Sequence, residues 1–325
     1  MPSRRAEERL RVQNGFRTNA FLLFNQMVKW CKDTNGNRHL VDEILHSILF
    51  LGKITIPSFS PEEIFGDVLD GLKNTYPEPF ESCETHLPRR SPFSCVLDMV
   101  VLQNQPNNED AIRSSLKNLV NSLEAKVLTS NSLEAKVLTS NSLEAKVLTS
   151  TVVCVSHSNT SGKHYGVSMS TTVPFARKIV IAASCLSSYW DEYVAGAVMS
   201  YDPDQRTRRE YFDGTIKLHK DAICKAYLVT DVTEYKPPCK FCQELFGLPG
   251  VETEKPMYPY GNCAEAESLS NLFKSDETIK QQCQPITLLH TPANRERARA
   301  DTQMFLKDVL KKARFNTWEN HYYPA

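Results

Sequence analysis

The spacing of apolar residues changes at residue 151, and this change constrains the possible fold more than any other feature. Before it, Phe16–Trp30 and Leu40–Leu51 carry apolar residues three and four positions apart, which is typical of one buried face of a helix. After it, Thr151–Ser156 and Tyr165–Thr171 are short apolar segments separated by turn-forming residues, which favours a hairpin of two strands. The sequence therefore predicts an all-helical N-terminal region followed by a domain that contains both helices and strands.

A capped helix start within the N-terminal region supports the helical prediction. In Ser60-Pro61-Glu62-Glu63, serine is a common N-cap, proline suits the first helical position, and acidic residues favour the first turn. We predict that the helical region spans residues 1–90. Its apolar faces are interpreted as core packing, and binding of a protein partner is the alternative interpretation.

Residues 151–325 contain further segments of both kinds. The predicted strands after the hairpin are Ala222–Val232 and Ile286–Leu289. One helix is predicted over Ser184–Val194, which lies between the apolar segments Lys178–Ala183 and Ala195–Ser200, and a second over Arg295–Arg314. Strands that alternate with helices along the chain are typical of an α/β layer fold. We therefore predict one α/β domain over residues 151–325.

Between these two parts, residues 121–150 consist of three identical copies of the decapeptide Asn-Ser-Leu-Glu-Ala-Lys-Val-Leu-Thr-Ser. Ten residues is not a multiple of the helical turn of about 3.6 residues, so the apolar positions step around a helix instead of lining one face. The period is also shorter than the repeats of solenoid proteins. We interpret the copies as a tolerated insertion in a linker that spans residues 91–150.

Charge and hydropathy narrow the classes of function. The 38 basic and 38 acidic residues balance, whereas proteins that hold a long polyanion usually carry a basic excess, so nucleic acid is not favoured as the main ligand. The sequence lacks a run of about 18 apolar residues, which argues against a membrane span. Its start, Met1–Arg5, lacks the apolar core of a signal peptide. We therefore expect a cytoplasmic or nuclear protein whose 10 cysteines are mostly reduced.

Two of these cysteines, Cys239 and Cys242, form a Cys-x-x-Cys motif at a predicted helix start. The motif follows the Ala222–Val232 strand and a pair of prolines. The amides and the positive end of a helix N-terminus lower the pKa of thiols placed there. Two thiols at this spacing can bind one metal ion with tetrahedral geometry, and the same pair can also act as a redox dithiol.

Cys263 marks a second predicted helix start. It follows Gly261-Asn262, a turn in which asparagine can cap a helix, and Glu265 comes two residues later. Two helix starts side by side can bring three thiolates to one zinc ion and leave the fourth position open to water, which is the pattern of a catalytic zinc site. A nearby carboxylate can then move a proton between the water and a leaving group.

Together these motifs resemble those of the zinc-dependent cytidine and nucleobase deaminase superfamily. That superfamily combines His/Cys-x-Glu with Pro-Cys-x-x-Cys, and the matching residues here are Cys263-Ala264-Glu265 and Pro238-Cys239-Lys240-Phe241-Cys242. The two motifs stand in the reverse of the usual order, as circular permutation would produce. The resemblance implies a three-layer α/β/α sandwich, a Zn²⁺ cofactor, Glu265 as proton shuttle, and hydrolytic deamination of a cytosine-type or related nucleoside or nucleobase. Tyr258, Tyr260 and Asn262 are the candidates for lining the substrate pocket.

Other readings of the same residues remain open. Cys283 as a fourth thiolate would make the zinc site structural, and His290 is a candidate ligand or pocket residue. The alternative function is a protein-interaction module that keeps a structural zinc ion and recruits a partner through its N-terminal helices. A third reading is a thiol redox protein that uses Cys239 and Cys242.

Overall fold

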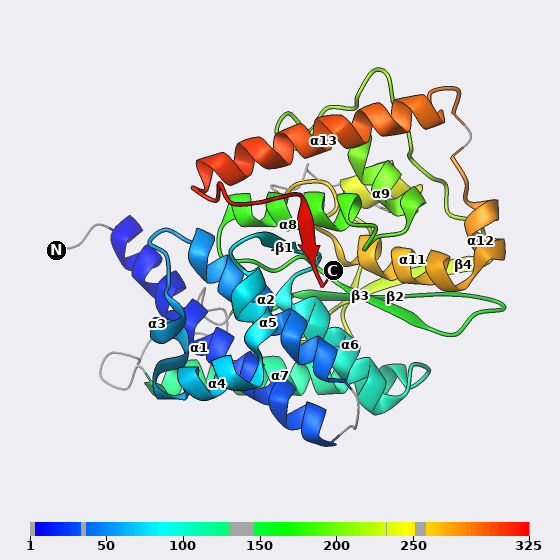
Figure 1. Cartoon of the computed structure of the whole chain (residues 1–325). Coiled ribbons are helices and arrows are strands. Elements are labelled where there is room, and N and C mark those ends of the chain that lie inside the picture. Colours follow the sequence, from blue (N-terminus) through cyan, green and yellow to red (C-terminus); the bar gives the residue numbers. More distant parts are fainter. Residues whose placement is uncertain are drawn as a thin grey trace.

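The computed structural model describes residues 4–33, 37–130, 146–231, 233–250, 258–285 and 287–324. Helices come first along the chain, and a sheet with further helices follows (Figure 1). The N-terminal elements are α1 (Arg4–Asp33), α2 (Arg38–Ile54), α3 (Pro61–Phe65), η1 (Gly66–Val68), α4 (Leu69–Thr75), α5 (Pro77–Ser82), β1 (His86–Pro88), α6 (Pro92–Asn104) and α7 (Glu109–Ser130).

The remaining elements contain a four-stranded sheet and six helices within the described residues. They are β2 (Val152–Ser158), β3 (His164–Val167), α8 (Pro174–Leu186), α9 (Glu192–Met199), β4 (Ala222–Leu228), β5 (Tyr235–Lys236), α10 (Lys240–Phe246), α11 (Ala264–Ser275), α12 (Glu277–Gln282), α13 (Pro292–Lys312) and β6 (His321–Tyr323). The strand order is β3-β2-β4-β5, and each neighbouring pair is antiparallel. The general prediction of a mixed α/β fold is therefore confirmed.

The predicted N-terminal helices form as expected. The apolar segments Phe16–Trp30 and Leu40–Leu51 lie within α1 and α2. Ser60 caps α3: its Oγ accepts a hydrogen bond from the backbone N–H of Glu63 (3.3 Å), and the Glu63 carboxylate accepts one from the backbone N–H of Ser60 (2.8 Å). This reciprocal pair satisfies backbone donors that have no partner inside the helix.

The N-terminal region is nevertheless not entirely helical. β1 lies at its end and pairs in parallel with β6 from the other end of the chain, so that Leu87 is opposite Tyr322. Figure 1 shows β6 running beside β1 between α2 and α8. The short length of β1 hides it from a pattern search, because three residues are too few to show an alternating period.

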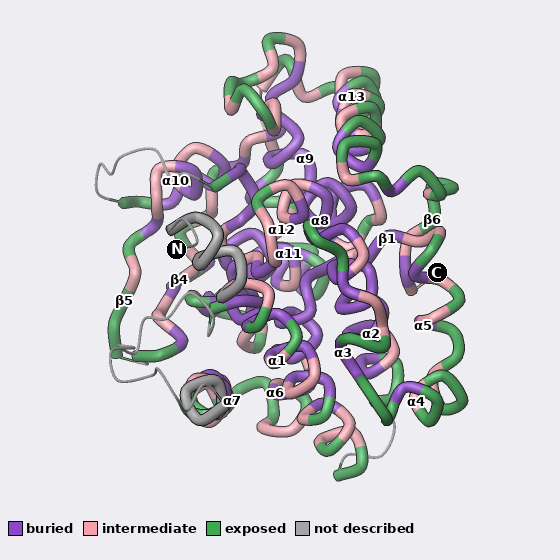
Figure 2. Tube along the Cα trace, turned by 90° about the vertical axis from the view of Figure 1, so that its left-hand side faces the viewer, coloured by how far each residue is buried: buried purple, intermediate pink, exposed green. Residues whose placement is uncertain are grey.

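Residues assigned to a linker contain structured helices. α6 is largely buried and contacts α2, and its Met99 belongs to the same hydrophobic core as Phe16 of α1 and Leu306 of α13. The first decapeptide copy continues α7, and residues 131–145 lie outside the described part of the chain. Figure 2 shows this shared core as the buried centre of the molecule. The division into domains stays a prediction.

Two local predictions in the second half are wrong. Ser184–Val194 is not one helix, because α8 ends at Leu186 and α9 begins at Glu192, where the Asp191 side chain accepts a hydrogen bond from the backbone N–H of Tyr193 (2.8 Å). Such a cap starts a new helix and stabilises the break before it. The described part of the predicted Ile286–Leu289 strand is a turn. The predicted Arg295–Arg314 helix is confirmed as α13.

The two faces of the sheet carry side chains of different size. Gly166, Cys154 and Ala226 are cross-strand neighbours on β3, β2 and β4, and this row of small residues faces α11. One residue along, Val153 is opposite Val167 and Tyr227, and this row faces the other way because successive side chains alternate. The guanidinium of Arg113 from α7 lies 3.7 Å from the centre of the Tyr227 ring. Helices therefore approach the sheet from both faces.

The row of small residues on β3, β2 and β4 determines how closely α11 can approach the sheet. A methyl group on Gly166 would lie 2.3 Å from the backbone nitrogen of Ser268 and 2.5 Å from the backbone oxygen of Ala264, both in α11. Ser156 supports the same contact, because its Oγ donates a hydrogen bond to the backbone oxygen of Ser268 (2.8 Å). The first half of α11, which carries Glu265, is thus held directly against the sheet.

Each helix in the described part of the chain is too short or too polar to cross a bilayer.

The buried His46 predicts a loss of stability in acid. Its ring is fully buried and stacks on Tyr323 of β6 with 4.2 Å between ring centres, and burial lowers the pKa of His46 to about 3. Unfolded histidine titrates near pH 6.5, so between about pH 6.5 and 3 the unfolded state binds the extra proton and stability falls as pH falls. Urea unfolding should show that His46 alone costs about 2 kcal/mol at pH 5 relative to pH 8.

The His46→Leu variant is the control for this prediction. Other groups also titrate in this range, so the quantity to compare is the difference between the two proteins at each pH. The variant should lose less stability than the wild type on acidification. Equal losses in both proteins would contradict the assignment.

Candidate metal centre

Cys239, Cys242 and Cys263 lie together in the structure. The Sγ atom of Cys239 is 3.4 Å from that of Cys263 and 3.7 Å from that of Cys242, and all three sulfur atoms lie within 4.8 Å of one another. Thiolates bound to a tetrahedral zinc ion at about 2.3 Å are about 3.8 Å apart. The three predicted ligands are therefore brought together at a spacing that fits a metal ion.

Two helix starts position these thiols. Cys239 is the N-cap residue of α10 and Cys263 is the N-cap residue of α11, and both have extended backbone conformations. Cys242 lies in the first turn of α10 and is fully buried. The predicted helix starts at both cysteines are confirmed. Their proximity is a tertiary feature, because 24 residues separate Cys239 from Cys263.

Gly261 shapes the approach to Cys263. Its φ of +85° lies in a region that residues with a side chain rarely adopt. An added methyl group would also lie 3.0 Å from Ile181 and 3.2 Å from Trp190. The turn at this glycine directs the chain into α11, and the backbone oxygen of the following Asn262 accepts a hydrogen bond from the backbone N–H of Met169 (2.8 Å).

The three thiols share hydrogen bonds that favour one thiolate. Hydrogen bonds from Cys242 and Cys263, together with backbone amides at the start of α10, lower the pKa of Cys239 to about 3. The hydrogen bonds with Cys239 raise the pKa of Cys242 and of Cys263. A metal ion that binds here would displace the remaining thiol protons.

Glu265 lies beside the thiols and is nearly fully buried, with 5% of its surface exposed. Burial, followed by the negative charge of Cys239, raises the pKa of Glu265 to about 7. A buried carboxyl group can hold or release a proton near neutral pH, which is what a general acid or base must do. The predicted acid/base residue therefore lies beside the thiols, and its catalytic role stays a prediction.

A cavity of about 490 Å³ opens onto the thiols and Glu265. Its volume lies in the range typical of sites for small molecules. Cys239, Cys263 and Glu265 line one part of it, and the segment after β3 lines another. The arrangement therefore combines a potential metal site, a buried acid and space for a ligand.

Comparisons with protein families, curated proteins and solved structures find no match to this chain.

The predicted pocket residues divide into two groups. Tyr258 and Asn262 line the cavity, and the buried Oδ1 of Asn262 has no hydrogen-bond partner among the described residues. Tyr260 does not line it. Its ring stacks between Tyr201 and Phe241 at 3.8 and 3.9 Å, and its hydroxyl donates a hydrogen bond to Glu244. Two of the three candidates are therefore placed where a ligand can meet them.

The two alternative ligands from the sequence, Cys283 and His290, lie outside the thiol cluster. Cys283 is outside the thiol cluster, and its sulfur accepts a hydrogen bond from the backbone N–H of His219 (3.2 Å). His290 packs against Phe212 and its Nε2 is 3.0 Å from Nη2 of Arg295. Among the described histidine, cysteine and acidic side chains, the cluster thus contains three protein ligands.

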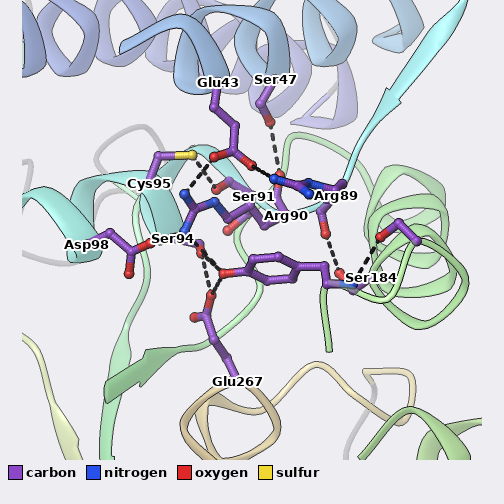
Figure 3. Close-up of polar contacts among 12 residues, drawn as sticks. Glu43, Ser47, Arg89, Arg90, Ser91, Ser94, Cys95, Asp98, Ser184 and Glu267 are labelled. Carbon is purple, nitrogen blue, oxygen red and sulfur yellow. Dashed lines mark hydrogen bonds and ion pairs between the residues drawn. The ribbon is translucent and has the colours of Figure 1, made fainter. Parts of the chain in front are cut away.

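A buried polar network connects α11 to the N-terminal helices (Figure 3). Arg90 lies between β1 and α6, and its Nη2 is 2.6 Å from the carboxylate of Glu43 in α2. It also donates hydrogen bonds to Asp98 of α6 and to the hydroxyl of Tyr189 (3.1 Å). Because these groups are mostly buried, removing one partner would leave a charge without compensation.

Glu267 is the end of this network on α11. Its carboxylate accepts hydrogen bonds from the hydroxyl groups of Tyr189 (2.8 Å) and Ser94, and from the backbone N–H of Val167 (2.8 Å). Sequence reasoning missed Glu267, although its position two residues after Glu265 offered a signal. The network holds the helix that carries Cys263 and Glu265 in place, so the N-terminal helices support the site.

Proposed function

We propose that this chain is a zinc-dependent hydrolytic deaminase that acts on a cytosine-type or related nucleoside or nucleobase. The observation that carries the proposal is the cluster of three thiols, two of which, Cys239 and Cys263, line one cavity together with the buried Glu265. Three protein ligands leave a coordination position free for water, whereas structural zinc sites have four. This ligand count favours a catalytic role over a structural one.

In this proposal, the chain's own residues bind the substrate and move protons. A zinc ion held by the three thiolates supplies an acidic, activated water when bound. As the water oxygen bonds to the amine-bearing ring carbon, Glu265 would move one water proton to the neighbouring ring nitrogen and the other to the amino group. The carbon–nitrogen bond would then break, ammonia would leave, and the ring carbon would keep the oxygen as a carbonyl. Asn262, which lines the cavity, would bind polar atoms of the base, and the burial of Glu265 would keep bulk water from competing for its proton.

The finer fold prediction, a permuted deaminase-like three-layer sandwich, belongs to the same proposal. It is supported by the motif helices α10 and α11, which meet at their N-termini, and by α11 packed on β2, β3 and β4. The reversed motif order does not alter ligand geometry, because coordination depends on where the thiols lie and not on which comes first in the chain.

The first test is the metal content of the purified full chain, prepared under reduction and without chelator. We expect about one zinc ion per chain, and loss of most of it in Cys263→Ala because two thiolates bind zinc much more weakly than three. Cys283→Ala is the matched control, since it also removes a buried thiol but one outside the cluster, and it should retain its zinc.

The zinc-loaded protein would then be screened for ammonia release from cytosine, adenine and guanine compounds. Absence of zinc in the wild-type protein would overturn the proposal. A reversible Cys239–Cys242 disulfide without stoichiometric metal would favour the redox interpretation, and zinc loss in the Cys283→Ala control would favour a four-ligand structural site.

A further inference from the structure

The cavity beside the thiols is lined by one arginine, Arg177, that has no ion-pair partner among the described residues. Its lining contains the cations Lys146, Arg177 and Lys236 together with Glu265 and the thiols of Cys239 and Cys263. Lys236 forms an ion pair with Glu234. Arg177 forms neither a hydrogen bond nor an ion pair through its guanidinium with any residue in the described ranges, and its Nε is buried without a partner.

The guanidinium of Arg177 is held in a way that leaves its donors free. It lies over the ring of Tyr258, 4.7 Å from the ring centre. Stacking uses the flat face of the guanidinium, whereas its N–H groups point outward in the plane. Partial burial lowers the pKa of Arg177, because removal from water disfavours its charged form. An anion in the cavity would compensate this charge.

The helix that carries Arg177 adds to the same positive region. α8 begins at Pro174, next to the cavity-lining Thr171 and Thr172, and its N-cap residue Val173 makes no side-chain capping bond. A helix N-terminus carries partial positive charge and favours anions, so a cation in its first turns is unfavourable unless an anion lies nearby. Arg177 is the fourth residue of this helix.

We infer that the ligand of this cavity carries a phosphate group bound by Arg177, and that the substrate is therefore a nucleoside 5′-monophosphate. The identity of the ligand as a nucleotide rests on the proposed function. A single phosphate also suits the balanced charge of the chain, because a polynucleotide would require a more extended basic surface. Arg177 binds the phosphate, and Asn262 binds the base near Glu265.

The test compares each nucleoside with its own 5′-monophosphate. For cytidine and CMP, and for the matching adenine and guanine pairs, kcat/KM and equilibrium binding are measured on the zinc-loaded full chain. We expect the monophosphate to be preferred by about 10- to 100-fold, which corresponds to charge-assisted hydrogen bonds to one phosphate. Arg177→Gln should reduce that preference mainly through a higher KM, and Arg177→Lys should restore part of it.

Lys178→Gln is the matched control, because it removes the neighbouring positive charge on α8. Lys178 pairs with Asp204 outside this cavity, so the monophosphate preference should persist. Binding of CMP that depends on Arg177 without turnover would support the phosphate site and overturn the deaminase proposal. Cytidine turnover with no preference for CMP would support the deaminase proposal and overturn the phosphate site. Turnover of a single-stranded oligonucleotide but not of CMP would overturn the monophosphate assignment.

Discussion

Glu265→Gln is expected to reduce the rate of ammonia release by about 10²- to 10⁴-fold while leaving the zinc content at the wild-type level. The amide has nearly the shape of the carboxylate but cannot accept and return a proton. Glu265 is not one of the three clustered ligand residues, so its replacement should not release the metal. Single-turnover assays on the best substrate from the screen would measure the loss in the chemical step.

Two further measurements make this result specific. Glu277→Gln applies the same change to an exposed residue at the start of α12, and its activity should match the wild type. Zinc analysis of Glu265→Gln shows whether the metal is retained. A Glu265→Gln protein with full activity would remove Glu265 from the mechanism, and one that had lost its zinc would show that Glu265 supports the metal instead.

Gly166→Ala is expected to destabilise the folded protein by about 3 kcal/mol or more. The new methyl group would lie 2.3 Å from the backbone nitrogen of Ser268 and 2.9 Å from the backbone carbonyl carbon of Glu267. Backbone atoms of a packed helix cannot rotate away as a flexible side chain can. α11 would have to move from the sheet, and the zinc affinity should also fall because Cys263 begins that helix.

Gly71→Ala is the matched control for this substitution. Gly71 lies in α4 with open space where a methyl group would be added, so alanine should change the free energy of unfolding by less than about 1 kcal/mol and in the stabilising direction. Urea unfolding of both variants gives the comparison. Equal stability of Gly166→Ala and the wild type would show that α11 is not held against β3 as closely as described.

Local sequence signals predicted the long helices of this fold more successfully than the breaks between neighbouring helices. The spacing of apolar residues in α1 and α2 and the capping residue Ser60 were sufficient to predict helices there, because the contacts along a helix join residues only three or four positions apart. The break between α8 and α9 was missed, because apolar residues continue on both sides of the capping Asp191.

For the candidate metal centre, the sequence by itself determined which thiols and which carboxyl group stand at helix starts. The spacing of Cys239 and Cys242, the turn before Cys263 and the position of Glu265 depend on helix starts, which neighbouring residues specify. Only the tertiary structure decided that these parts meet, that Tyr260 packs in the core, and that Arg177 reaches the same cavity. The physical reason is that strand register and helix packing bring together residues that are far apart in the chain. The register of β3, β2 and β4, for example, aligns the small residues Gly166, Cys154 and Ala226 beneath α11.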